Sequence, residues 1–140
     1  MAFLLGFSKT YGYAGSENSI TVPVLLRAGD RQVDLVASVD TGASDCLFER
    51  SYAEALGLNV ELGISKVFAT ANSRFEAFGH DVTISTLGLE FHSMAFFFAD
   101  STIRKNVLGR RGWLDRARIG IVDHDQILYL ADYDDPVSEP

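Results

Sequence analysis

Asp40, Thr41 and Gly42 form the segment of this sequence best suited to chemistry. They stand where an apolar run at residues 35–39 ends, so Asp40 is expected at the end of a buried strand. A carboxylate held in this way can accept or donate a proton during a reaction. By itself the triplet also fits an ordinary Asx-type turn after a strand. Its interpretation therefore depends on the rest of the chain.

A second element lies far downstream, where Val107, Leu108 and Gly109 precede Arg110. The two apolar residues predict a short core strand. The glycine lets that strand pass close beneath another backbone loop, because glycine has no Cβ atom. Taken alone, the run would be a core strand that ends at a turn, with Arg110 at the surface. After the Asp40 segment, it is the second of two motifs in a defined order.

Together the two motifs resemble those of the retropepsin-like (retroviral-type) aspartic proteases. That family carries Asp-Thr/Ser-Gly-Ala/Ser after an apolar strand and, well downstream, two apolar residues, Gly, often Arg, and a short helix. A hairpin candidate at residues 66–84, with its tip near Asn72, stands at the place of the family's flap. The resemblance covers residues 20–130. It implies a mostly β fold, a single-lobe closed β-barrel with one or two short helices, which acts as a homodimer.

The resemblance also implies a role for each matching residue. Asp40 would be the catalytic carboxylate, Thr41 would hydrogen-bond across the two-fold axis, and Gly42 would offer its carbonyl to the substrate backbone. Arg110 would brace the loop and the dimer interface. The structural support of the site would be Val107, Leu108, Gly109 and Arg110. The substrate-binding residues would be Gly42, Ala43, Ser44, Ala71, Asn72 and Ser73.

Two departures from the family pattern concern the flap and the loop. Ser73 stands at the flap tip, where relatives often have glycine. Ser44 stands where retroviral members often carry an acidic residue that pairs with the arginine matching Arg110. Asp45 is adjacent but is expected to point the other way, so the sequence identifies no partner for Arg110. Ser44 does match the Asp-Thr-Gly-Ala-Ser variant of cellular and bacterial relatives.

Aspartic proteolysis requires two carboxylates that share one proton around a water molecule. This chain has one Asp-Thr-Gly, and its 140 residues are too few for two such lobes. The second aspartate must come from a second copy, and a two-fold axis through the site places Asp40 opposite Asp40. The expected function is therefore that of an aspartic endopeptidase, active as a homodimer on an extended peptide or protein substrate.

The elements expected to position these residues are mostly short strands separated by turns. The strands are predicted at residues 20–27, 32–39, 64–70, 75–86, 89–98, 107–109, 119–122 and 126–130. Two short helices are predicted at residues 50–58 and 110–116. The whole chain is interpreted as one domain, with its core at residues 20–131 and an acidic, flexible tail at residues 132–140.

Composition and charge limit the binding partners and the cellular compartment that we expect for this protein. Lys and Arg number 12 against 19 Asp and Glu, and the net charge of −7 disfavours nucleic acid and anionic membrane surfaces as partners. Cys46 is the only cysteine, which excludes an internal disulfide, and it is expected to pack in the core. No apolar stretch is long enough for a membrane span, and the apolar start has no basic region like that of a signal peptide. We therefore expect a soluble, cytoplasmic protein.

Two other functions remain open. A catalytically silent relative could serve as a peptide-binding or dimerisation module, because fold does not guarantee function. An enzyme of another class, such as a metal hydrolase, is the second alternative. The run Asp123-His124-Asp125 invites a metal, but a polar turn between strands accounts for it. We expect no metal and no other cofactor.

Overall fold

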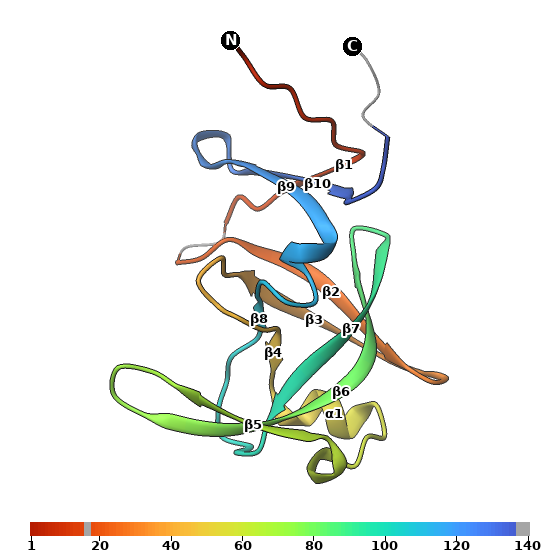
Figure 1. Cartoon of the computed structure of the whole chain (residues 1–140), viewed down its shortest axis with the longest axis vertical. Helices are drawn as coiled ribbons and strands as arrows, with labels where there is room; N and C mark the ends of the chain where they lie inside the picture. The colour runs from red at the N-terminus through yellow and green to blue at the C-terminus, as the bar shows by residue number, and fades with distance from the viewer. Residues whose placement is uncertain (16–17, 137–140) are drawn as a thin grey trace.

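Ten strands and one α-helix make up the part of the chain that the computed structural model describes, residues 1–15 and 18–136 (Figure 1). The strands are β1 (Lys9–Gly12), β2 (Thr21–Ala28), β3 (Arg31–Val39), β4 (Leu47–Phe48), β5 (Ile64–Ala69), β6 (Arg74–Thr86), β7 (Leu89–Phe98), β8 (Val107–Leu108), β9 (Ala117–Val122) and β10 (Ile127–Asp132). The helix is α1 (Arg50–Ala55), and three 3-10 turns are η1 (Val60–Leu62), η2 (Leu114–Arg116) and η3 (Asp123–Asp125). Within these residues, no helix has the length and apolar character that crossing a membrane requires.

Seven strands form a sheet that closes on itself. Its hydrogen-bonded order is β2-β3-β8-β4-β7-β6-β5, and β2 also pairs with β6. The strands from β2 to β6 in this order therefore form a closed ring, while β5 lies outside the ring and pairs only with β6. The mostly β barrel predicted from the sequence is confirmed. Its predicted strands differ from the observed ones only at their ends, but the short strand β4 was not predicted.

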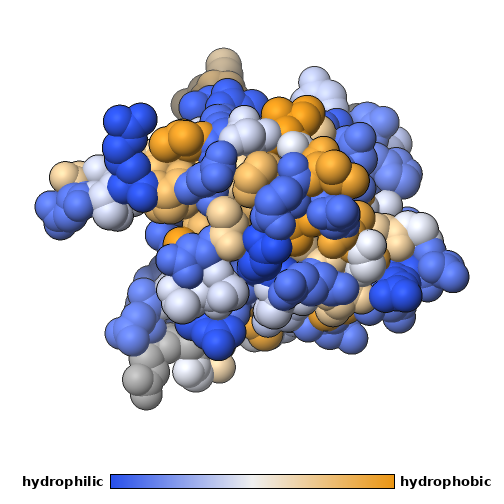
Figure 2. All heavy atoms as spheres, turned by 90° about the horizontal axis from the view of Figure 1, so that it is seen from below, coloured by the Kyte–Doolittle hydropathy of each residue, from blue (hydrophilic) through white to orange (hydrophobic). Residues whose placement is uncertain are grey.

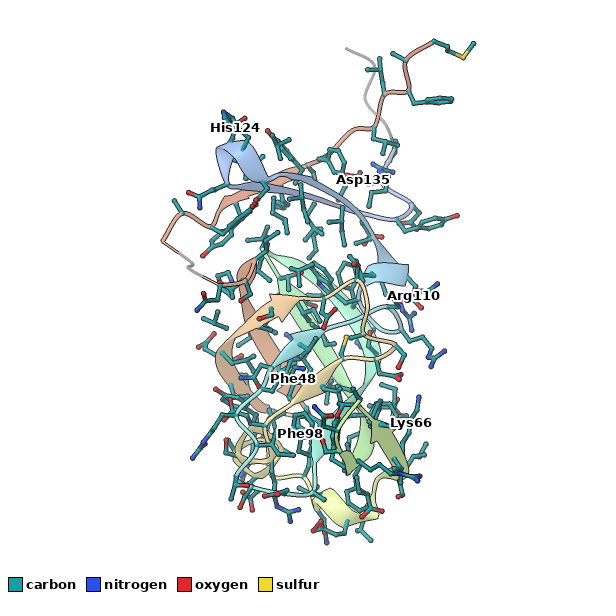
Figure 3. The ribbon with its side chains drawn as sticks, turned by 90° about the vertical axis from the view of Figure 1, so that its left-hand side faces the viewer. Phe48, Lys66, Phe98, Arg110, His124 and Asp135 are labelled. Carbon is teal, nitrogen blue, oxygen red and sulfur yellow. The ribbon has the colours of Figure 1, made fainter. Side chains whose placement is uncertain are left out.

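Alternating side chains of the strands fill the interior of the barrel. On β2, Val22, Val24 and Leu26 are buried, as the two-residue period of a strand requires. Phe48 on β4 and Phe97 on β7 meet in the interior, with ring centroids 5.9 Å apart. In Figure 3 the label of Phe48 lies over the middle of the barrel. This core holds the strand ends that carry the candidate site.

A second, three-stranded sheet joins the two ends of the chain in the order β1-β10-β9. Lys9 of β1 lies opposite Leu130 of β10, so the first strand belongs to the fold although the predicted core began only at residue 20. The predicted tail at residues 132–140 starts with the last residue of β10, and residues 137–140 lie outside the described part. Figure 1 shows this sheet above the barrel, with the N-terminal residues leading away from it.

The first predicted helix is present but shorter than residues 50–58. It ends at Ala55, and Leu56 is its C-cap. Gly57 follows with φ of +75°, the left-handed conformation that commonly terminates a helix.

The second predicted helix, at residues 110–116, is wrong, because only the 3-10 turn η2 forms there. Arg111 instead makes an isolated parallel bridge with Asp45. Gly112 then adopts φ of +105°, and a Cβ atom there would lie 3.2 Å from Cβ of Ser93. Pairing with a distant loop therefore overrides the helical preference of this segment.

Candidate active site

Asp40 stands at the end of β3, at the point where β3 pairs in parallel with β8. Val39 lies opposite Leu108, and the backbone N–H of Asp40 donates to the carbonyl oxygen of Leu108 at 3.0 Å. The half-buried side chain of Asp40 accepts a hydrogen bond on Oδ1 from the N–H of Gly42 at 2.9 Å. Its Oδ2 atom accepts no hydrogen bond from the described residues, and Thr41 is exposed beside it. One carboxylate oxygen is thus held by the loop, and the other is left for a water or a partner.

Gly109 lies directly beneath the loop that carries Asp40. A Cβ atom at this position would lie 2.2 Å from the carbonyl oxygen of Asp45 and 2.8 Å from that of Ala43. The next residue, Arg110, donates its backbone N–H to the carbonyl oxygen of Ala43 at 2.9 Å. The close approach expected of glycine in the second motif is therefore present, and the chain after β8 supports the loop through its backbone.

Asp45, which ends the loop, is the one buried charged residue among those described. Its Oδ2 accepts hydrogen bonds from Nζ of Lys66 at 2.7 Å and from Oγ of Ser44 at 2.8 Å. Its Oδ1 lies 3.4 Å from Nε of Arg111. Burial alone would raise the pKa of this carboxyl, but the hydrogen bonds from Lys66, Ser44 and Arg111 outweigh it and hold the pKa below its ordinary value.

The arginine that reaches the loop with its side chain is Arg111, and not Arg110 as the sequence motif suggested. The side chain of Arg110 is exposed and makes no hydrogen bond or ion pair within the described residues (Figure 3). The parallel bridge between Asp45 and Arg111 explains the shift, because it aligns the side chain of Arg111 with the carboxylate. Asp45 does not reach Arg110, as expected, yet it has partners of its own. The role of Arg110 at a dimer interface stays a prediction.

The flap hairpin consists of β5 and the first half of β6. Pairing runs from Ile64 opposite Gly79 to Ala69 opposite Arg74. The predicted flap at residues 66–84 therefore extended too far, because the rest of β6 pairs with β7 and β2 in the barrel. In Figure 1 the hairpin projects to the lower left, and Figure 2 shows a projecting arm with hydrophilic side chains at its end.

The hairpin tip forms its hydrogen bonds within itself. The backbone N–H of Thr70 donates to the carbonyl oxygen of Ser73 at 2.8 Å, and the N–H of Ser73 donates to Oγ1 of Thr70 at 3.1 Å. Ala71 and Asn72 are exposed between them. In the described residues, no hydrogen bond joins this tip to the Asp40 loop, so its contact with a substrate stays a prediction.

An apolar wall connects the loop to the hairpin. Phe68 and Phe75 of the hairpin stack with ring centroids 5.7 Å apart. They also contact Phe96 and Phe98 of β7 at 5.5 and 5.1 Å, respectively. Ala43 packs against the same cluster from the loop. The loop and the hairpin therefore share one cluster of apolar side chains.

Two other candidates for chemistry have structural explanations. Cys46 is buried, and burial raises the pKa of its thiol to about 12. Asp123, His124 and Asp125 form the turn η3, where Asp123 accepts a hydrogen bond from the hydroxyl of Tyr13. Figure 3 shows His124 near one end of the molecule and Lys66 toward the other. Among the described residues, no group of three or more His, Cys, Asp or Glu could hold a metal ion.

The residues that sequence reasoning missed are Lys66, Asp45 and Arg111. Asp45 precedes the buried run that starts at Cys46, and an acidic residue at the edge of such a run signals a buried partner. Lys66 carried no signal, because its contact with the loop depends on how the hairpin sits over the barrel.

Comparison with known proteins agrees with this fold. The family model described as "Aspartyl protease" matches residues 22–123. Among solved structures, a retropepsin-like aspartic protease from Rickettsia conorii has a TM-score of 0.58 and 20% identity, covering 83% of this chain and 100% of that one. The EIAV protease in complex with the inhibitor HBY-793 has a TM-score of 0.53 and 21% identity, covering 69% of this chain and 86% of that one. No match is found among curated proteins.

Proposed function

Because the chain belongs to the aspartyl protease family and has a retropepsin-like fold, we propose that it is an aspartic endopeptidase that acts as a homodimer. Family membership suggests peptidase activity. The observation that carries the proposal is the geometry of Asp40: it stands at a strand end, with Oδ1 held by the N–H of Gly42 and Oδ2 free of hydrogen bonds from the described residues.

The proposed reaction uses two Asp40 carboxylates, one from each subunit. Two like charges about 3 Å apart repel each other, so the proposed pair shares one proton. The ionised carboxylate takes a proton from the water as it attacks the scissile carbonyl carbon. The protonated one donates to the carbonyl oxygen, which gives a neutral tetrahedral intermediate. Collapse of that intermediate breaks the C–N bond. The carboxyl that took the proton of the water gives it to the leaving amine, and the other carboxylate takes back the hydroxyl proton of the intermediate.

The second subunit is proposed because one chain supplies a single loop of this kind. Thr41 is exposed beside Asp40 and makes no hydrogen bond in the described residues, so its hydroxyl is available to the loop of the partner. A peptide is proposed to lie extended between the Asp40 loops and the hairpins, where the aromatic wall at Phe68 and Phe75 offers apolar contacts.

The test is cleavage of a peptide library, read by mass spectrometry between about pH 4 and 7. We expect the wild-type protein to cut peptides and the Asp40→Asn variant to lose activity by about a thousandfold or more, because the dyad loses its general base. Asp34→Asn is the matched control, since it removes an exposed carboxylate of the same strand.

Circular dichroism and sedimentation show whether both variants remain folded and associated. Equal cleavage by wild type and folded Asp40→Asn would contradict the proposal. Absence of cleavage by a folded wild-type dimer would favour the catalytically silent module, and loss of cleavage on chelation would indicate a metal hydrolase instead.

A further inference from the structure

Lys66 is the polar link between the flap hairpin and the Asp40 loop among the described residues. Its ammonium nitrogen lies 2.7 Å from Oδ2 of Asp45, whose side chain is only 5% exposed. The same nitrogen lies 5.1 Å from the ring centroid of Phe68 and 5.4 Å from that of Phe96. Both the charge and the aromatic rings therefore hold this side chain in one place.

The carboxylate that receives Lys66 is itself fixed from the side of the loop. Arg111 approaches the other oxygen of Asp45 at 3.4 Å, and it belongs to the segment that supports the loop after Gly109. Ser44, the neighbouring loop residue, also donates to Asp45. A shift of Lys66 relative to the barrel would therefore change the hydrogen bonds of Asp45 and, with them, the loop that carries Asp40.

The hairpin has a base fixed by close backbone contacts. Its edge strand β5 contacts β7 and the loop through Phe68 and Lys66. At the base, a Cβ atom on Gly63 would lie 2.5 Å from the carbonyl oxygen of Gly79, and Nε2 of His80 lies 2.9 Å from the carbonyl oxygen of Val60. Beyond the base, β5 is an edge strand that pairs only with β6. Lys66 lies on this strand between the base and the tip, which is the position from which one contact can hold a hairpin down.

We propose that Lys66 is a positioning residue. Through its ion pair with Asp45, which Arg111 also contacts, it holds the flap hairpin in place over the loop that carries Asp40. This inference rests on the proposed protease function for its kinetic consequence, but not for its structural one. A hairpin released from Asp45 pivots about its base and leaves the arrangement that binds peptide.

Asp45 is suited to this role in the acidic range in which a carboxylate pair works. Its pKa is held below the ordinary value, so the carboxylate keeps its charge, and with it the bond to Lys66, at mildly acidic pH. A neutral acid at this position would give Lys66 and Arg111 a much weaker acceptor.

The structural test is hydrogen–deuterium exchange of the full chain in Lys66→Met and Lys66→Arg variants. Lys66→Met keeps an apolar stem of similar length but removes the charge, and we expect the amides of residues 64–69 to exchange about tenfold faster, the factor expected for one charge-assisted hydrogen bond. Lys66→Arg keeps a cation and should restore slow exchange. Glu76→Gln is the matched control, because Glu76 bonds Ser65 within the hairpin and does not touch the loop.

The kinetic test separates positioning from general stability. Apparent affinity falls with the fraction of molecules in the competent arrangement, so Lys66→Met should raise KM, by at most about tenfold, and leave kcat within about twofold of wild type. A purely structural role would instead reduce the active fraction, lowering apparent kcat at unchanged KM. Glu76→Gln should leave both constants unchanged.

Unchanged exchange at residues 64–69 in folded Lys66→Met would overturn the inference. If that variant does not fold, Asp45→Asn removes the other end of the same link, and unchanged exchange there has the same meaning. Inactive wild-type protein would defeat the proposed function, while the exchange experiment would still decide whether Lys66 holds the hairpin.

Discussion

Close backbone contacts around the loop allow only glycine at position 109. The carbonyl oxygens of Asp45 and Ala43 occupy the space in which any other residue would place its Cβ atom. The carbonyl oxygen of Ala43 cannot move freely, because it also accepts the N–H of Arg110. The glycine is therefore a requirement of the backbone crossing itself, independent of any substrate.

We predict that Gly109→Ala destabilises the fold by about 3 kcal/mol, because overpacking here must displace backbone atoms. Urea denaturation followed by circular dichroism measures the loss. Gly12→Ala is the control, since its Cβ would lie 4.0 Å from the nearest atom, the carbonyl oxygen of Gln126, and should change stability by less than about 0.5 kcal/mol. Equal effects of the two substitutions would show that the loop and β8 do not press together as described.

Asp45 should make the free energy of unfolding decrease as the pH falls into the acidic range. Its folded-state pKa lies below the ordinary value of 3.8, so its contribution is present above that pH and is lost as the pH falls through the folded-state pKa. We predict that wild type exceeds Asp45→Asn in unfolding free energy by about 1–3 kcal/mol near neutral pH, and that the difference shrinks in acid. Denaturation from about pH 2 to 7 measures it.

The exposed Asp34 provides the comparison for this experiment, because it makes no ion pair within the described residues. Asp34→Asn should track wild type across the range. A constant difference between wild type and Asp45→Asn at every pH would mean that the charge of Asp45 contributes nothing to stability.

Among the elements, those predicted well are bounded by local signals. The strand β7 occupies the predicted residues 89–98, because a mostly apolar run follows the turn at Gly88. The β2–β3 hairpin follows from Gly29 and Asp30 in the same way. These elements could be found because their evidence lies within the segment itself.

The elements that were missed or wrong depend on partners far along the chain. β1 has a polar sequence and exists through its pairing with β10, while the two residues of β4 pair with β7 and β8. The predicted helix at residues 110–116 does not form, because Arg111 pairs with Asp45 in a parallel bridge instead. For the same reason the candidate site was predicted at Asp40 and Gly109, where motifs are local, and missed at Lys66, where only the assembled hairpin brings the side chain to the loop.

The tip of the flap hairpin is held by Thr70, whose Oγ1 bonds both the N–H and the hydroxyl of Ser73. We predict that Thr70→Val speeds hydrogen exchange of the Ser73 amide about fivefold, the effect expected for one neutral hydrogen bond. Ser73→Ala keeps the backbone bonds of the turn and should stay near wild type. Exchange resolved by nuclear magnetic resonance measures both variants, and a tip equally protected in Thr70→Val would contradict the prediction.

For the whole molecule, the proposed shared site means that only a dimer with two intact Asp40 residues is active. When wild type is mixed with an equal amount of Asp40→Asn and subunits exchange at random, only about a quarter of the dimers contain two wild-type chains. We predict that activity per wild-type chain falls to about half, because mixed dimers have one carboxylate where the chemistry needs two. Activity per wild-type chain that does not change on mixing would show that each chain works alone.

The parallel pairing of β3 with β8 has a consequence for the biosynthesis of the protein. Asp40 leaves the ribosome long before Leu108 and Gly109, the residues that hold its loop from below. Contacts between distant segments form late in folding, because the intervening chain must first be ordered. In a growing chain the carboxylate of Asp40 is therefore synthesised before β8 and Gly109, which hold its loop in place. If the proposed function is correct, this order of assembly keeps a nascent protease inert until Leu108 and Gly109 have been synthesised.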